Sequence, residues 1–289
     1  MAEIEIGRGK SARRGVGLQD LSIVPTRRAR DIDDVDLSWK IDAYRFDLPF
    51  IAAGVDRVVT AADAVTLGEQ GALGMVDLEA VWAENPDPAA LGAHIARIKD
   101  ADVRIAAGVS AARAEELAPH AIAAEVDILV IHDGVISAEV VSTSPTALNL
   151  KTFIRTLDIP VVVGGCTSYS AALHLMRTGA AGVIVGVDQP ELGIGVPLAS
   201  AIGDARAARV RHLDETGVYC HLIARGDIST GADVAKAIAC GADAVLLDAS
   251  VLLGADTQAG DVVANLREAM SICGFTDLKG FQKVEVVIR

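Results

Sequence analysis

Eight short apolar runs, each followed by a stretch with helical periodicity, are the feature that most restricts how this chain can fold. The runs consist mainly of Val, Ile, Leu and Ala, and they span residues 48–56, 72–78, 103–110, 126–133, 159–166, 181–188, 218–227 and 242–250. Parallel strands that are buried on both faces have this composition, and they need helical crossovers between them. The sequence therefore predicts eight strand-then-helix units.

The helical stretches between the runs cover residues 61–70, 88–99, 111–124, 148–157, 168–178, 196–214 and 229–240, and a last helix is expected at 261–272. Such units predict an α/β fold, a single-domain (β/α)8 TIM barrel, because closure leaves no strand edge exposed. An open doubly wound sheet is the alternative. We expect an N-terminal arm and lead-in at 1–47, the barrel at 48–273, and a C-terminal tail packing on the barrel at 274–289.

The charge balance restricts the partners. The net charge of −13 and the sequence pI near 4.8 argue against a nucleic acid and against an anionic membrane surface. No apolar run is long enough to span a bilayer and no leader is recognisable, so a cytoplasmic protein is expected. A basic stretch at residues 8–14 is interpreted as a solvated arm or subunit contact, with an anion site as the alternative.

In barrels of this kind the chemistry lies where the strands end. Those ends are rich in carboxylates, and the candidates for catalysis are Asp56, His132, Asp133, Asp188, Asp227 and Asp248. Neighbouring carboxylates raise each other's pKa or recruit a cation, which favours an amine-bearing ligand or a divalent metal. The alternative is that individual aspartates cap the following helices or pair with arginines.

His132 is the preferred general base, because imidazole titrates near neutrality. Adjacent strand residues point to opposite faces, so only one of His132 and Asp133 is expected to enter the pocket. A packed or exposed histidine without a role is the alternative. The candidates for substrate binding at the same strand ends are Arg57, Ser110, Gly164, Gly165, Cys166, Glu191 and Arg225.

Cys166 follows two glycines that would let a ligand approach the backbone. Its thiol is a candidate nucleophile, although a structural cysteine is the stronger interpretation, since no activating base is evident nearby. The loop at residues 193–197 carries free amides before a helix, which favours either an anion site or a simple turn.

Several segments together resemble the inosine monophosphate (IMP) dehydrogenase and guanosine monophosphate (GMP) reductase family, especially its actinobacterial dehydrogenase-related branch. They are IGRGK at 6–10, DAYRF at 42–46, VVGGC at 162–166, ACGADAV at 239–245 and FQKVEV at 281–286. The resemblance implies a barrel that oxidises or reduces a purine nucleotide with a nicotinamide cofactor, through a thioimidate on a loop cysteine. It also implies a homo-oligomer, a tetramer or larger.

The motifs that carry this chemistry depart from the family's pattern. The stretch GVDQPELG at 186–193 is shorter than the family's cysteine loop and holds no cysteine, which would exclude the thioimidate route. The family's Ala-Asp-Gly-Gly-Ile reads ARGDI at 224–228, its Gly-Ser phosphate pair reads Asp248-Ala249, and its Pro-Met-Asp strand end reads AGVD at 53–56. A carboxylate about 4 Å from a phosphate would repel it by roughly 4 kcal/mol, so a nucleotide monophosphate should bind poorly.

Three interpretations of function follow. The first is a repurposed barrel that acts by acid–base chemistry, of the isomerase, cyclase or lyase type, on a small non-nucleotide ligand in specialised metabolism. The second is a catalytically silent relative with a binding or regulatory role. The third keeps NAD(P)-dependent redox chemistry, with Ser110, Gly164 and Gly165 lining a cofactor groove. No cofactor is assigned, and NAD(P) and a divalent metal remain open.

Overall fold

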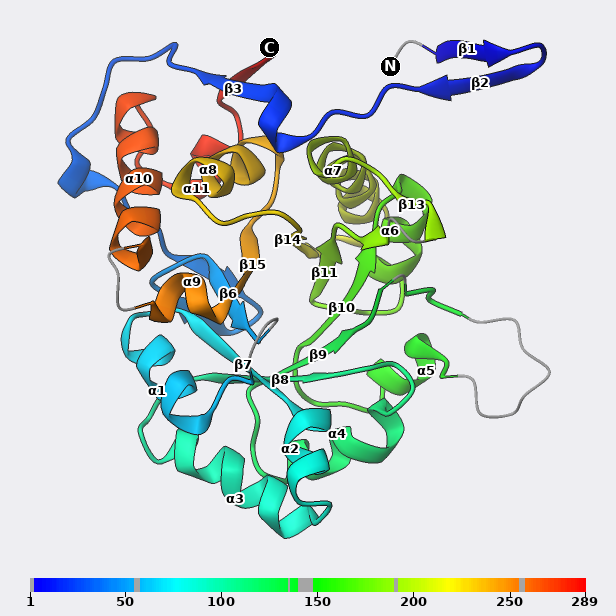
Figure 1. Cartoon of the computed structure of the whole chain (residues 1–289), viewed down its shortest axis with the longest axis vertical. Helices are drawn as coiled ribbons and strands as arrows, with labels where there is room; N and C mark the ends of the chain where they lie inside the picture. The colour runs from blue at the N-terminus through cyan, green and yellow to red at the C-terminus, as the bar shows by residue number, and fades with distance from the viewer. Residues whose placement is uncertain (1–2, 55–57, 135, 140–147, 190–191, 255–257) are drawn as a thin grey trace.

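The computed structural model describes residues 3–54, 58–134, 136–139, 148–189, 192–254 and 258–289. Eight parallel strands close into a barrel that is surrounded by helices (Figure 1). In barrel order they are β6 (Phe50–Ala53), β7 (Leu73–Asp77), β8 (Ile105–Val109), β9 (Ile128–His132), β10 (Val161–Cys166), β11 (Gly182–Val185), β14 (His221–Arg225) and β15 (Ala244–Asp248). Each expected apolar run contains one of these strands, and β15 pairs with β6 to complete the ring. The predicted fold class is confirmed.

The helices that cover the strands also fall where periodicity placed them. They are α1 (Ala61–Glu69), α3 (Pro88–Lys99), α4 (Ala114–Ala123), α5 (Leu150–Ile154), α6 (Tyr169–Met176), α7 (Leu198–Thr216), α8 (Gly231–Cys240) and α10 (Gln258–Ile272). No described helix combines the length and the apolar character needed to cross a membrane.

Two short helices beside the barrel strands were not anticipated, and both start directly after a strand. They are α2 (Leu78–Glu84) after β7 and α9 (Ala249–Leu253) after β15. The carboxylates of Asp77 and Asp248 accept hydrogen bonds from backbone amides in the first turn of these helices. Acidic side chains are favoured at such positions because they satisfy amides that have no partner within the helix.

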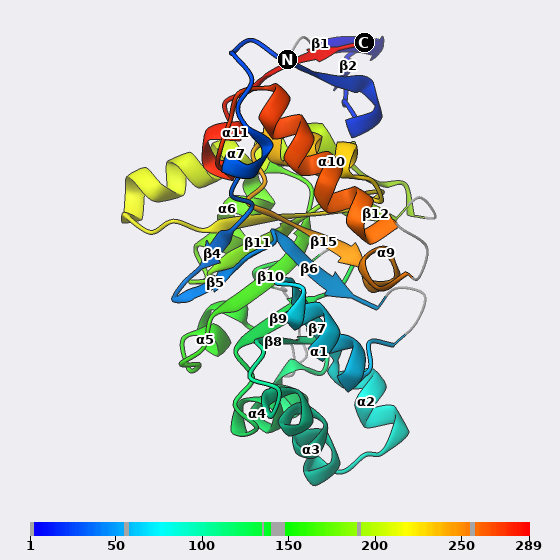
Figure 2. The same ribbon diagram turned by 90° about the vertical axis from the view of Figure 1, so that its left-hand side faces the viewer.

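The segments that precede and follow the barrel in the sequence pair with each other. The lead-in holds a hairpin of β1 (Glu3–Gly7) and β2 (Lys10–Arg13), the turn η1 (Leu18–Asp20), β3 (Leu21–Val24), the turn η2 (Ile32–Asp34), and a hairpin of β4 (Trp39–Ile41) and β5 (Tyr44–Phe46). The tail holds α11 (Leu278–Phe281) and β16 (Glu285–Ile288), and β16 pairs antiparallel with β3. The first hairpin extends away from the barrel, and both chain ends lie on the same side of the molecule (Figures 1 and 2).

Two aspartates tie neighbouring strands together at the amino-terminal end of the barrel. Asp127 directly precedes β9, and its carboxylate accepts a 2.9 Å hydrogen bond from the first amide of β8, that of Ile105. Asp243 directly precedes β15 and accepts a 2.8 Å bond from Leu222 of β14. Each aspartate also donates a backbone hydrogen bond to the same partner: the Asp127 amide to the Ile105 carbonyl, and the Asp243 amide to the Leu222 carbonyl. These two strand clamps are equivalent and lie four strands apart in the barrel.

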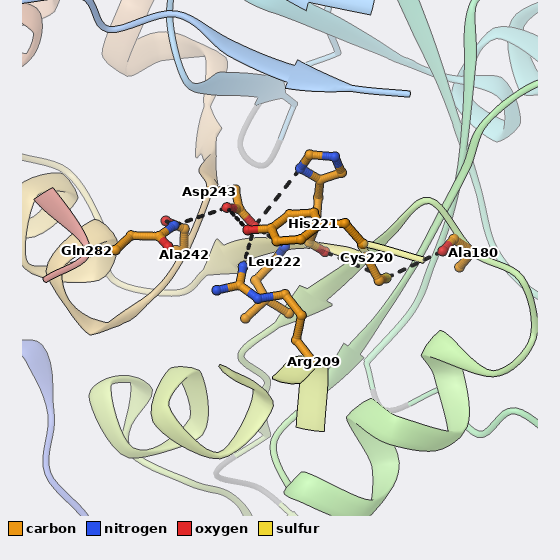
Figure 3. A network of polar contacts seen from close by, with 9 residues as sticks. Ala180, Arg209, Cys220, His221, Leu222, Ala242, Asp243 and Gln282 are labelled. Carbon is orange, nitrogen blue, oxygen red and sulfur yellow. Dashed lines mark hydrogen bonds and ion pairs between the residues drawn. The ribbon is translucent and has the colours of Figure 1, made fainter. Parts of the chain in front are cut away.

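The clamp at Asp243 has the larger set of partners (Figure 3). Its carboxylate lies 2.6 Å from Nη1 of Arg209, and the two side chains are 11% and 6% exposed. It also accepts hydrogen bonds from the Tyr219 hydroxyl at 2.7 Å and from Nε2 of Gln282 at 3.0 Å. The clamp therefore joins α7, β14, β15 and the C-terminal tail through one buried anion.

Buried histidines make stability depend on pH. The pKa values of His94, His132, His212 and His221 are lowered, in each case mainly by burial. Below the ordinary pKa of about 6.5 the unfolded chain binds protons that the folded chain does not, so the stability these groups contribute falls as the pH falls. We expect the thermal midpoint to be steady above about pH 7 and to drop toward pH 5.

Thermal unfolding in matched buffers checks this expectation. A fall between about pH 6.5 and 5 lies above the range in which carboxylates with lowered pKa values titrate, so it isolates the histidines. Replacing one buried ring in the variant His212→Gln should make the fall smaller. A midpoint that stays level or rises at the lower pH would contradict the assignment.

Candidate functional site

A pocket of about 440 Å³ opens at the carboxyl-terminal end of the barrel. Three segments line it: residues 17–19 of the lead-in, residues 186–187 and 193–198 after β11, and residues 225–227 after β14. Gly186 has a φ of +115°, and a side chain there would overlap the carbonyl oxygen of Arg225. Glycine at this position lets the loops after β11 and β14 come together and form one wall of the pocket.

The expected ring of acids is only partly present at this end of the barrel. The carboxylate of Asp248 caps α9, as the structural alternative supposed. Asp227 lines the pocket and is exposed, while a carboxylate oxygen of Asp133 accepts a 2.8 Å hydrogen bond from the amide of Gly134. Asp56, Arg57 and Glu191 lie outside the described residues, and Asp188 is described only as part of the two-residue strand β12 (Asp188–Gln189), which pairs with β13 (Ile194–Gly195).

His132 ends β9 and is half-buried. Its Nε2 atom is buried and has no hydrogen-bond partner in the described part of the chain. The ring occupies space that Gly108 of β8 leaves free, because a Cβ on Gly108 would lie 2.9 Å from this nitrogen. Burial lowers the His132 pKa, the positive charge of Arg225 lowers it further, and Asp77 and Asp133 partly oppose the shift. The imidazole is therefore neutral at neutral pH and able to accept a proton.

Arg225 ends β14 and is half-buried in the wall of the pocket. Within the described part of the chain its guanidinium has no ion pair and no hydrogen bond. Burial lowers the Arg225 pKa, and the charge of Asp133 opposes that shift. Two strands separate β14 from β9, and the charge of Arg225 still acts on the pKa of His132 across that separation.

Three further predicted binding residues, Cys166, Gly164 and Gly165, are closely packed in this structure. Cys166 is 1% exposed, and burial raises its pKa to about 12, so its thiol is protonated and shielded. A Cβ on Gly164 would lie 2.5 Å from the Ile184 side chain, and one on Gly165 would lie 2.7 Å from the Gly186 carbonyl. The glycines thus allow β10 and β11 to pack closely and do not open a gap for a ligand. The amide of Ser110 donates a 2.8 Å hydrogen bond to Glu79.

Three residues near the mouth were not singled out from the sequence. Asp77 ends β7 in the same way as the aspartates that were chosen, so the pattern of strand-ending acids could have found it. Glu79 follows it on α2 and acts electrostatically on His132. Gly108 is a glycine inside a strand, which is a known sign of a close approach. Among the described residues, no group of three His, Cys, Asp or Glu side chains is arranged to hold a metal ion.

A family model decides the ancestry of the barrel. The model described as "IMP dehydrogenase / GMP reductase domain" matches residues 15–285. The chain belongs to the IMP dehydrogenase and GMP reductase family. Two relatives are named as uncharacterized oxidoreductases: one from Mycobacterium tuberculosis at 40% identity and one from Mycolicibacterium smegmatis at 38%, each aligned over 99% of both chains. These mycobacterial relatives confirm the expected actinobacterial branch.

A solved structure shows the same fold. The crystal structure of an IMP dehydrogenase/GMP reductase-like protein from Corynebacterium glutamicum superposes with a TM-score of 0.88 at 36% identity, covering 99% of this chain and 98% of that one.

The family member described here is shorter than its mycobacterial relatives. Their alignments with this chain are 372 positions long, whereas this chain has 289 residues, so at least 83 positions face a gap. All eight barrel strands are present and paired, so the shortening falls outside the strands.

Proposed function

We propose that this family member has given up the cysteine route of its relatives and performs acid–base chemistry on a small non-nucleotide molecule at the mouth of the barrel, with His132 as the proton acceptor. The observation that carries the proposal is the ring of His132 itself. It is neutral, has a buried Nε2 that no described residue contacts by a hydrogen bond, and feels the charge of Arg225 at the end of the barrel where such folds keep their active sites.

The state of the thiols supports the loss of covalent catalysis. The four cysteines are at positions 166, 220, 240 and 273, none of them in the stretch 186–198 after β11. Burial raises the pKa of all four, so none offers a thiolate near neutral pH. The carboxylate of Asp248 also occupies the start of α9, where relatives would place amides for a phosphate, and this argues against a nucleotide monophosphate.

A nicotinamide-dependent oxidoreductase is the second candidate, and the printed names of the mycobacterial relatives favour it. The residues expected to line its cofactor groove do not fit that role. The space beside Gly164 and Gly165 is filled by neighbouring residues of the barrel, and the backbone amide of Ser110 donates a hydrogen bond to Glu79. For that reason redox chemistry ranks below acid–base chemistry.

The test compares the wild type with His132→Asn in an extract of actinobacterial metabolites, followed by mass spectrometry. We expect the wild type to convert at least one metabolite and the variant to be slower by a factor of about 100 or more. The matched control is His174→Asn, which replaces an exposed histidine on α6 and should leave turnover unchanged.

Three outcomes would overturn the proposal. One is equal turnover by the wild type and the His132 variant. Another is a change in nicotinamide absorbance when the wild type is given IMP with NAD or GMP with NADPH, which would establish the second candidate. The third is conversion of no metabolite at all, which would point to a catalytically silent relative.

A further inference from the structure

The guanidinium of Arg225 is a cation in the wall of a pocket, and it has no counter-ion among the residues that the structure describes. Half-burial removes much of its water, and the described residues supply no acceptor for its five N–H donors. Burying a charge without a partner is costly, because the lost hydration is not replaced. An anion bound from solution would replace the hydrogen bonds to water that the guanidinium loses on folding.

The nearby carboxylates leave this position open. Asp227, two residues further along, lines the same pocket but is exposed, and it forms no ion pair with Arg225. Asp133 is close enough to oppose the lowering of the Arg225 pKa, yet its described hydrogen bond comes from the amide of Gly134. Asp77 uses its carboxylate to cap α2. The acids at the mouth are thus engaged or hydrated, whereas the cation is free within the described chain.

The rest of the pocket suits an apolar body of modest size. Its volume of about 440 Å³ falls in the range of small-molecule sites. Apart from Arg225, Asp227 and Gln19, the lining consists of glycine backbone and of apolar side chains such as Leu18, Ile194 and Leu198. A planar guanidinium binds carboxylate and phosphate groups through two parallel hydrogen bonds, which gives the anion a fixed orientation.

We propose that Arg225 binds the oxyanion group, a carboxylate or a phosphate, of a small ligand whose largely apolar body lies between residues 17–19 and 193–198. This inference rests on the site of the proposed function and specifies its substrate class. It also reverses the ligand charge expected from the sequence, where the many aspartates favoured an amine or a metal.

Four probes with the same six-carbon tail test the head group: heptanoate, hexyl phosphate, protonated hexylamine and hexanol. We expect one or both anions to bind in calorimetry more tightly than the amine and the alcohol, and the tighter anion identifies the head group. The variant Arg225→Gln should weaken anion binding at least tenfold, and Arg225→Lys should retain part of it. Arg113→Gln is the matched control, because Arg113 is paired with Glu116 at the surface and should not affect binding.

The pKa of His132 provides a second measurement, and a general loss of structure would not change it in the expected way. Since the charge of Arg225 lowers the His132 pKa, a bound anion should raise that pKa in the wild type, as followed by NMR. In Arg225→Gln the His132 pKa should already be higher and should not respond to the anion. Circular dichroism of each variant checks that it is folded.

The inference is overturned by any of three results: the amine or the alcohol binds as tightly as the anions, the Arg225→Gln variant binds the anions as well as the wild type, or no anion binds at millimolar concentration. Its failure differs from failure of the proposed function. His132→Asn should lose turnover and still bind the anion, whereas Arg225→Gln should lose the anion.

Discussion

The variant Asp243→Ala is expected to lower the free energy of unfolding by about 3–5 kcal/mol, because it leaves a buried guanidinium without its anion. Arg209 is 6% exposed and lies 2.6 Å from Asp243, so water cannot replace the lost carboxylate without opening the structure. The substitution also removes the acceptor of the Tyr219 hydroxyl, of the Leu222 amide and of one Gln282 hydrogen bond. For a protein of this size the thermal midpoint should fall by about 5–8 °C.

Urea unfolding of the variant measures this loss, and Glu116→Ala is the matched control. Glu116 also forms an ion pair with an arginine, but the pair with Arg113 is at the surface, with side chains 53% and 33% exposed. Exposed pairs of this kind contribute little, so the control should unfold like the wild type. Equal behaviour of the two variants would mean that Asp243 does not tie the strands together.

The variant Gly186→Ala should be destabilised by at least about 2 kcal/mol and should lose the shape of the pocket. The backbone at Gly186 has a φ of +115°, which a residue with a side chain rarely adopts, and the added methyl would overlap the carbonyl oxygen of Arg225. Relief requires the loops after β11 and β14 to separate, and both loops line the pocket. Binding of the hexyl anions should therefore fall together with stability.

Gly203→Ala is the matched control for this substitution. Gly203 lies within α7, where an added Cβ would meet no atom within 4 Å. Alanine in a helix interior is favoured over glycine, so this variant should be more stable than the wild type by about 0.5–1 kcal/mol. If Gly186→Ala were as stable as this control, the close approach at Gly186 would be of no importance.

Periodicity was sufficient to predict the barrel. Each apolar run became a strand because parallel strands buried on both faces leave a strong signal in the sequence. The short helices α2 and α9 gave no such signal, since one or two turns do not establish a period. Their starting aspartates, Asp77 and Asp248, instead resembled members of an acidic pocket, and only the structure separates a helix cap from a free carboxylate.

The sequence selected residues at the mouth of the barrel but could not show how their charges are paired. His132 and Arg225 were both selected because they end strands, and both lie at the mouth. The sequence cannot show whether a charged side chain has a partner, because partners come from strands far apart in the chain. For the same reason the clamps at Asp127 and Asp243 were not anticipated, although each directly precedes a strand.

The position of the two clamps bears on how far the loops at the mouth could change without loss of the fold. They join neighbouring strands at opposite points of the barrel, at the end away from the pocket. Their hydrogen bonds involve no residue of the loops at the mouth. Deletions in those loops would leave both strand clamps intact. A scaffold secured in this way tolerates substitutions and deletions in its loops while its folding stability stays within the range that selection tolerates.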